Sequence, residues 1–337
     1  MNLPALITQS LLYKKLASDI ELEGAVTNLR AKAESLAGTL VRDADTFTDH
    51  TIRHMDALWL VAEKILTVDE IQGMTSGEAF LLATGFYFHD IGMSYAATSE
   101  GRKSLEQTPD YAGVISAAKP DTDPGTVRRK ALAHAIRIHH ARVAQELAIG
   151  PIPGTTEYLL EPKSIRDQFG AICGQIAASH HWSVDRVEAE LGAQEIVPMA
   201  NNRTADLGFV AGALRLIDYA HINRERAPPL DRAIRPPLVA ESAVHWDAQQ
   251  NIDGPSRAQG TNELVYSSSP LADVDAWWLI YEFARGLDQE IAQVRRFLKG
   301  RKVSSDRLSL VGVRGANSPE DFGKLVKTNG FLPLAGC

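Results

Sequence analysis

The stretch TSGEAFLLATGFYFHDIG, residues 75–92, decides the fold of this chain. Its first four residues, Thr75 to Glu78, form a capping box, the pattern that opens a helix. The apolar run Ala79–Phe88 continues this helix, and the adjacent pair His89–Asp90 comes at its C-terminal end. Gly92, just beyond the pair, is typical of a helix stop. We therefore predict a helix that presents an imidazole and a carboxylate side by side at its end.

Apolar residues at helical spacing predict further helices on both sides of this stretch. These cover residues 10–40, a segment after 43–49, and residues 126–147, 164–181, 204–223 and 273–298. Glycine, proline, aspartate and threonine instead predict a loop over 99–125. Between 228 and 270, prolines interrupt the chain and β-type runs such as Glu263–Ser267 predict short strands. Leu308–Val313 is one more candidate strand.

The fold class that follows is mainly α, with a small α+β C-terminal part. We expect a helical domain over residues 1–228 and a C-terminal extension over 229–337, with short strands and a long helix, packed on it.

Composition places the chain among ordinary globular proteins and excludes several classes. It has 337 residues, 45% of them hydrophobic, and a net charge of -7, which argues against a broadly basic nucleic-acid-coating surface. The two cysteines, Cys173 and Cys337, exclude a disulfide framework and a cysteine-rich zinc site. No stretch approaches the roughly 20 apolar residues of a membrane helix, and no signal peptide opens the chain. We predict a cytoplasmic protein.

The ten histidines carry the functional argument. They are His50, His54, His89, His134, His139, His140, His180, His181, His221 and His245. One histidine on a helix is usually a surface or core residue, and His134, His221 and His245 have that interpretation. Two His-His doublets and a His-Asp pair at helix ends or on helix faces indicate a metal site. Imidazole and carboxylate ligands together suit Mn, Fe, Co, Ni or Zn.

The order of the ligand types resembles a family. A histidine in a helix (His54), then His89–Asp90, then an aspartate within a later helix (Asp218) is similar to the HD superfamily of metal-dependent phosphohydrolases. The resemblance implies an HD-type helical bundle and two divalent metal ions. One ion would be held by His54, His89, Asp90 and Asp218, and the other by Asp90 as a bridge with His140, His180 and His181.

Two positions near this set stay open. His139 and His140 differ by about 100° in direction on a helix, and we favour His140 because Val143, Ala144 and Leu147 lie on its side. His50, four residues before His54, can face the same site, either behind the metal ligands or toward the substrate.

The subfamily is suggested by further segments. The histidines His140 and His180–His181 are similar to the two-metal HD domains, among them the HD-GYP phosphodiesterases, although the Gly-Tyr-Pro motif is absent. Four C-terminal segments, Arg215–Asp218, Asn223–Arg226, Val244–Trp246 and Val294–Leu298, resemble the HD-CE type. That type is found ahead of GHKL-type ATPase modules in bacterial conflict and defence proteins. The resemblance implies a fused or associated ATPase as partner, leaves an oligomer open, and gives antiviral defence as the setting.

The function we predict is hydrolysis of a nucleotide or nucleic-acid phosphoester by metal-activated water, as a phosphohydrolase or phosphodiesterase. Asp90 is the central catalytic residue. Of the five arginines near the presumed ligands in sequence, we expect Arg137 and then Arg224 to bind phosphate; the other three are Arg53, Arg142 and Arg226. Tyr87 and Tyr219 are candidates for a base pocket, with core packing favoured. Two other functions compete: a non-catalytic module that senses a nucleotide and regulates an attached ATPase, and an iron-dependent oxygenase.

Overall fold

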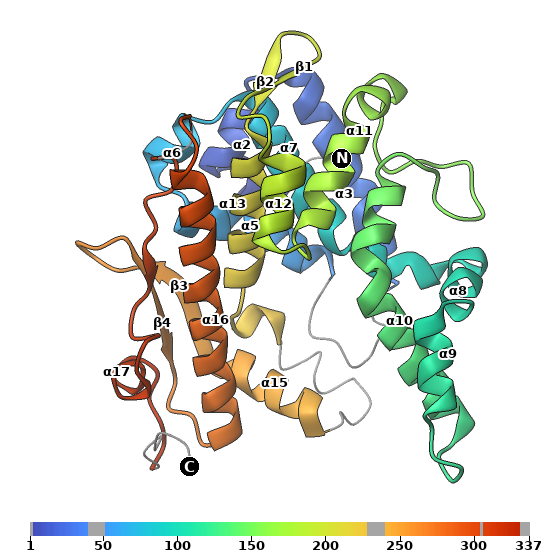
Figure 1. The fold of residues 1–337 in the computed structure, drawn as a ribbon, viewed down its shortest axis with the longest axis vertical. Helices are drawn as coiled ribbons and strands as arrows, with labels where there is room; N and C mark the ends of the chain where they lie inside the picture. The colour runs from blue at the N-terminus through green and yellow to red at the C-terminus, as the bar shows by residue number, and fades with distance from the viewer. Residues whose placement is uncertain (1–2, 40–50, 228–239, 304–305, 331–337) are drawn as a thin grey trace.

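The chain folds into a helical bundle around one central helix, α7 (Ser76–Ile91). The computed structural model describes residues 3–39, 51–227, 240–303 and 306–330, and Figure 1 traces their path. Every residue of α7 from Gly77 to Ile91 is buried, so this helix is apolar on all sides. The predicted capping box is present, because the Thr75 hydroxyl and the Glu78 carboxylate each accept the other's backbone N–H.

Six helices pack directly on α7 and form the bundle. They are α2 (Leu11–Leu16), α3 (Ile20–Ala37), α5 (Ile52–Ile65), α10 (Pro124–Leu147), α11 (Lys163–Ser179) and α13 (Leu207–Ala220). Shorter elements join and flank them: α1 (Ala5–Thr8), α6 (Val68–Gln72), η1 (Gly92–Ala97), α12 (Val184–Leu191), η2 (Arg224–Arg226) and the hairpin of β1 (Val197–Met199) with β2 (Arg203–Ala205). No helix in the described ranges is long and apolar enough to cross a membrane.

Two predictions about the helices were wrong. The single helix expected over residues 10–40 is broken before Asp19, whose carboxylate accepts the Leu22 N–H and starts α3 afresh. The loop expected over 99–125 holds two helices, α8 (Ser99–Glu106) and α9 (Pro109–Ser116), beside α10. Thr108, one of the residues that suggested a loop, is the N-cap of α9, and Thr98, just before the expected loop, is the N-cap of α8. Helix starts and turns favour the same residues.

The C-terminal part adds the small mixed portion that the sequence predicts. It comprises α15 (Ala240–Asn251), β3 (Ile252–Arg257), β4 (Glu263–Ser268), α16 (Val274–Lys299), β5 (Gly312–Val313) and α17 (Pro319–Gly323). Strands β3 and β4 are antiparallel, with Ile252 opposite Ser268, and β5 lies parallel to β4. The prediction of a mainly α fold with a small α+β part is thus confirmed. The helix α15 lies within the segment 228–270, where only short strands were expected.

The C-terminal part is joined to the bundle by apolar and ionic contacts. One hydrophobic cluster runs from Ile7 to Val326 and includes the inner face of α16, which lies along α13. Arg307 donates to both carboxylate oxygens of the buried Glu78, at 2.6 and 2.8 Å. The boundary that we expect at 228/229 falls among residues outside the described ranges and stays a prediction.

Gly92 has a different role from the one its sequence position suggests. Its backbone is right-handed, with φ -60°, so it is not the left-handed stop residue of a helix. A Cβ at this position would lie 2.0 Å from the carbonyl oxygen of His140. Glycine is required because the end of α7 and the helix α10 approach each other here, which brings His140 close to Asp90.

Candidate metal centre

The first group of possible metal ligands comes from α5 and the end of α7. His54, His89 and Asp90 are all buried, and each offers an atom within 4.8 Å of the others. The Nε2 atoms of His54 and His89 lie 3.1 Å apart. Asp218, from α13, faces the same group, with its Oδ1 3.4 Å from both Nε2 atoms. Three helices distant in sequence thus bring together the four residues expected at the first metal.

The second group comes from α10 and the end of α11. His140, His180 and His181 each offer a nitrogen within 4.8 Å of the others, and the Nε2 atoms of His140 and His180 are 3.2 Å apart. Asp90 lies between the two groups. Its Oδ2 is 3.2 Å from His89 Nε2, and its Oδ1 is 3.8 Å from His140 Nε2. The carboxylate therefore turns one oxygen toward each group.

Three of these imidazoles are oriented by their own helices. The Nδ1 of His89 lies 3.1 Å from the Phe86 carbonyl, and His140 and His180 make the same contact three residues back, at 2.8 and 2.6 Å. A carbonyl oxygen can only accept, so each Nδ1 carries the proton and donates it. In the neutral ring the lone pair then lies on Nε2, the atom that faces the site. Metal-binding histidines usually have this arrangement, so the residues fit a metal ion.

The two groups differ in charge. Burial works against a charged His89, but the carboxylates of Asp90 and Asp218 outweigh it and raise the pKa of His89 to about 10. Burial, reinforced by the neighbouring charge of His89, lowers the pKa of His180 to about 3. Burial also opposes ionisation of Asp218, yet the cation and hydrogen bonds beside it hold its pKa well below the usual range.

His54 is oriented by a residue that the sequence did not single out. Its Nδ1 lies 2.7 Å from the Nδ1 of His221, with ring planes within 4° and centroids 4.9 Å apart. At that nitrogen distance the two rings meet edge to edge in one plane. One proton lies between the two nitrogens, so the tautomer of either histidine determines that of the other. The signal in the sequence was that His221 lies one turn before Arg224 and could therefore neighbour the site.

Arg215 secures the turn that carries the His180–His181 doublet. Its Nη1 donates to the carbonyls of Ser179 and His180, at 2.7 and 3.3 Å, and also to that of Trp182. The carbonyls of Ser179 and His180 end α11 and have no partner within the helix, and that of Trp182 lies in the turn that follows. The Nε of Arg215 donates at 2.6 Å to Glu290, on α16. The position of the doublet therefore depends on a helix of the C-terminal part.

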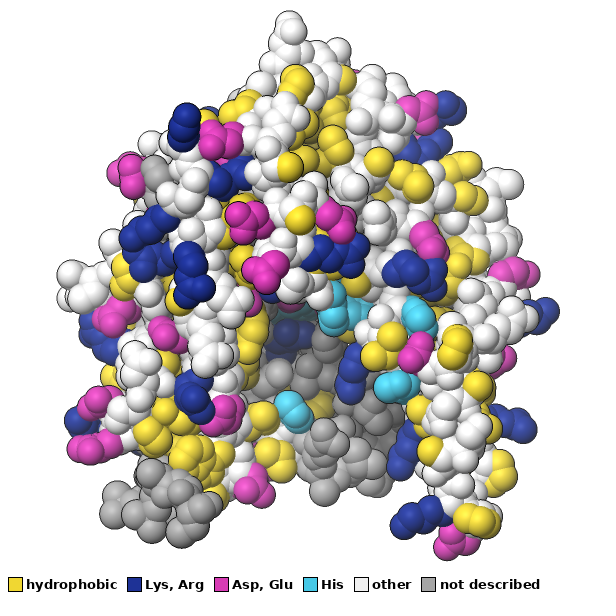
Figure 2. All heavy atoms as spheres, in the orientation of Figure 1, with side chains coloured by type: hydrophobic (Ala, Val, Ile, Leu, Met, Phe, Trp, Pro, Cys, Tyr) yellow, Lys and Arg dark blue, Asp and Glu magenta, His cyan; other side chains and the backbone are white. Residues whose placement is uncertain are grey.

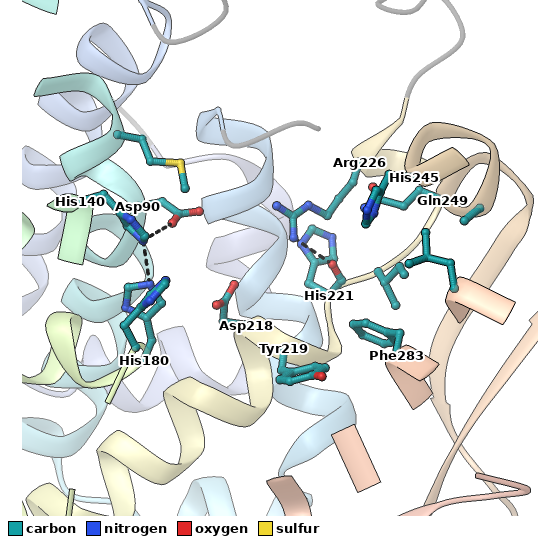
Figure 3. Close-up of a pocket in the computed structure, with 15 residues that line it drawn as sticks. Asp90, His140, His180, Asp218, Tyr219, His221, Arg226, His245, Gln249 and Phe283 are labelled. Carbon is teal, nitrogen blue, oxygen red and sulfur yellow. Dashed lines mark hydrogen bonds and ion pairs between the residues drawn. The ribbon is translucent and has the colours of Figure 1, made fainter. Parts of the chain in front are cut away.

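A cavity of about 360 Å³ opens onto the centre. Figure 2 shows a hollow on this face with histidine side chains around it. Figure 3 shows Asp90, His140 and His180 on one side of the cavity and Phe283 and Gln249 on the other. The floor and walls therefore come from both the bundle and the C-terminal part.

The comparison with known protein families agrees with this geometry. A model of the HD-CE family matches residues 44–293, which include both groups of ligands and most of α16. The chain belongs to the HD-CE family. No curated protein and no solved structure matches it. The match confirms the resemblance drawn from the order of His54, His89–Asp90 and Asp218.

The other candidate residues of this HD-CE chain lie as follows. His139 turns away from the centre, and its Nε2 is 2.9 Å from the Asp110 carboxylate, so His140 is the doublet member that reaches it. His50 lies outside the described residues. Arg137 is exposed on α10, and the exposed Arg224 pairs with Asp253. Neither is among the described residues that line the cavity.

Three residues that line the cavity were not the ones favoured from the sequence. Arg226 lines the cavity where we expected Arg224, and its Nη1 donates to the His221 carbonyl at 3.3 Å. His245 and Gln249 also line it, one turn apart on α15. Their helix was not predicted, so no pattern placed them beside the metal ligands.

Proposed function

We propose that this HD-CE chain is a phosphohydrolase or phosphodiesterase that uses two divalent metal ions to cleave a nucleotide or nucleic-acid phosphoester. The observation that carries the proposal is the orientation of Asp90. Its two oxygens face two separate groups of imidazoles, as a carboxylate that bridges two metal ions would. Bound metal ions would supply a water with its pKa lowered from about 15.7 toward about 7, together with positive charge beside the phosphoryl oxygens.

The residues of the chain would divide the work. His54, His89, Asp90 and Asp218 would hold one ion, and His140, His180 and His181, with Asp90, would hold the other. The carbonyl-bound Nδ1 atoms keep the lone pairs of His89, His140 and His180 directed at the site. Arg226 lines the same cavity, and its planar guanidinium suits a phosphate group. It is our candidate for the phosphate-binding arginine, in place of Arg137 and Arg224.

The test begins with protein stripped of metal and reloaded with Mn, Fe, Co, Ni or Zn. Each form is assayed on nucleotides, cyclic dinucleotides, and single- and double-stranded nucleic acids. We expect metal-dependent release of a phosphoester product. Asp90→Asn should lose bound metal and activity while its circular dichroism stays native. Asp110→Asn, which removes a carboxylate that contacts a histidine outside the centre, is the matched control and should retain both.

A second variant tests the number of ions. Replacement of His180 and His181 together by alanine should reduce the bound metal from two equivalents toward one, measured by inductively coupled plasma mass spectrometry. Full metal content and full hydrolysis in Asp90→Asn would refute the site. Metal binding with no hydrolysis of any substrate would favour the regulatory nucleotide-sensing module, and a mixed-valent iron pair would favour the oxygenase.

A further inference from the structure

The cavity extends well beyond the metal ligands. Its far wall is built by the end of α13 and by the C-terminal helices α15 and α16, and it includes Tyr219, Ile222, Gln249, Leu279 and Phe283. Figure 3 shows Phe283 and Gln249 on the side of the cavity opposite Asp90, His140 and His180, with His221 and Arg226 in between. A volume of about 360 Å³ lies within the range of roughly 300–1,000 Å³ that small-molecule sites occupy.

This far wall is aromatic, and its rings are held in place. The rings of Tyr219 and Phe283 have centroids 5.1 Å apart, and Tyr266 packs edge-on against Phe283 at 5.9 Å. Tyr266 is fixed in turn, since its hydroxyl donates to the Ala220 carbonyl at 2.8 Å. A Cβ at Gly286 would lie 2.1 Å from the Tyr219 hydroxyl, so only glycine allows Tyr219 this position. The two ring planes are inclined by 48°, so a flat partner can stack on one ring and meet the edge of the other.

The same wall contains buried polar atoms that have no partner among the described residues. They are the Oε1 of Gln249 and the Nε2 of His221, on side chains that are 8% and 1% exposed. A buried polar atom without a hydrogen bond is destabilising, and native proteins leave few of them. The oxygen of Gln249 accepts, so the partner it lacks is an N–H or O–H donor. Rotation of the terminal amide, a soft torsion, can turn it toward the cavity.

We propose that this wall is a subsite for the heteroaromatic base of a nucleoside phosphate. The base would lie against Tyr219 and Phe283 and donate an N–H from its edge to Gln249. A hydrocarbon chain would leave the polar atoms of Gln249 and His221 unpaired, whereas a base offers both a π face for the rings and N–H donors at its edge. The inference rests on the proposed function, because it places the phosphate of the same ligand beside Arg226 and the Asp90 centre.

The first test measures binding without metal or catalysis. Isothermal titration calorimetry of the chelator-treated chain with adenosine, guanosine, cytidine and uridine should detect binding of at least one nucleoside. Gln249→Met keeps the length of the side chain but removes its acceptor, and it should lower the affinity for that nucleoside about tenfold. Phe283→Leu should lower the same affinity severalfold, because the ring contact is lost. Gln289→Met, on an exposed position of α16, is the matched control and should bind as the wild type does.

The outcomes separate this subsite from the proposed function. Absence of binding by all four nucleosides, or equal affinities in wild type, Gln249→Met and Phe283→Leu, would overturn the subsite. Thermal unfolding of each variant shows whether a weakened affinity reflects a folded protein. Hydrolysis is scored separately on ribose 5-phosphate, which has no base, and on nucleotides. Nucleoside binding with the expected variant pattern, but without metal-dependent hydrolysis, would support the subsite and contradict the enzymatic function. Hydrolysis without nucleoside binding would support the enzymatic function and contradict the subsite.

Discussion

At the scale of single residues, the centre depends on how each imidazole is oriented and charged. His89 and His180 are close in space and end helices of the same bundle, yet their pKa values are shifted in opposite directions. Carboxylates surround His89, whereas His180 is buried beside a cation. A metal ion binds the neutral imidazole, so the two histidines respond differently to pH when metal binds.

We predict that metal binding displaces a proton from His89. Because its pKa in the metal-free chain is about 10, His89 is protonated at pH 8, and a metal ion must replace that proton. The apparent affinity should therefore rise by about tenfold per pH unit from pH 7 to 9 and level off near pH 10. His180, with a pKa of about 3, is already neutral and adds nothing to this slope.

Calorimetry of metal binding at pH 8, in two buffers of different ionisation enthalpy, measures the protons released. The expected value is at least one per chain. An affinity that is constant between pH 7 and 9 would contradict the charge state assigned to His89. Protonation of His89 also stabilises the metal-free folded chain. The pKa of His89 in the folded chain lies above the usual 6.5, so the stabilisation from its protonation is complete below pH 6.5 and is lost as the pH rises toward 10.

The sequence predicts the ligands of this centre better than their surroundings. His54, His89, Asp90 and Asp218 could be chosen because their order along the chain is characteristic and each lies on a predictable helix. The contact between His54 and His221 and the approach of Gln249 to the cavity depend on how helices cross. No local pattern records such crossings, so these residues could be found only in the folded structure.

At the scale of elements, helix ends position the site. The centre is assembled from the C-terminal ends of α7 and α11 and from single residues within α5, α10 and α13. The sequence predicts these long helices because their apolar residues repeat clearly. It did not predict α8 and α9, since Thr98, Thr108 and Pro109 favour turns as strongly as they favour helix starts.

We predict that Arg215 is a positioning residue for the His180–His181 doublet. Arg215→Lys keeps the charge but loses the planar group that reaches three carbonyls and Glu290 together. The turn should loosen, and the affinity for metal should fall about 10- to 100-fold, as when other contacts that orient metal ligands are removed. Competition with a chromophoric chelator measures this affinity.

The control is Arg314→Lys, in the C-terminal part. Arg314 pairs with Glu263 at 3.0 Å in a partly exposed ion pair, so this substitution should leave the metal affinity unchanged. A merely structural role for Arg215 would lower the unfolding temperature without changing metal affinity. That result would contradict the positioning role.

At the scale of the whole molecule, the C-terminal part and the bundle share buried ion pairs. Glu78, at the start of the central helix, accepts the N–H groups of Thr75 and Asp206, both at 2.9 Å, as well as the guanidinium of Arg307. Asp206 in turn accepts from Arg301 at 2.8 Å. Both carboxylates are almost fully buried. Residues beyond 293, where the HD-CE match ends, therefore neutralise charges inside the bundle.

We predict that Arg307→Met destabilises the whole chain. The substitution leaves the buried carboxylate of Glu78 without its cation, and the loss of one partner of a buried pair costs about 3 kcal/mol in the free energy of unfolding. Urea denaturation followed by circular dichroism measures it. Arg285→Met removes the cation of an exposed pair with Glu282 and should change the stability little. Equal effects of the two substitutions would refute the role of the buried pair.

Helix α16 has a consequence for how the two halves of the cavity influence each other. It carries Phe283 in the far wall and, two turns along, Glu290, which holds Arg215 and through it the turn of His180. A ligand ring that shifts α16 would therefore also shift a metal ligand. Thermodynamic linkage makes the effect reciprocal, so occupancy of the metal centre would change the affinity for the ring by the same factor. One helix would thus couple the two binding equilibria.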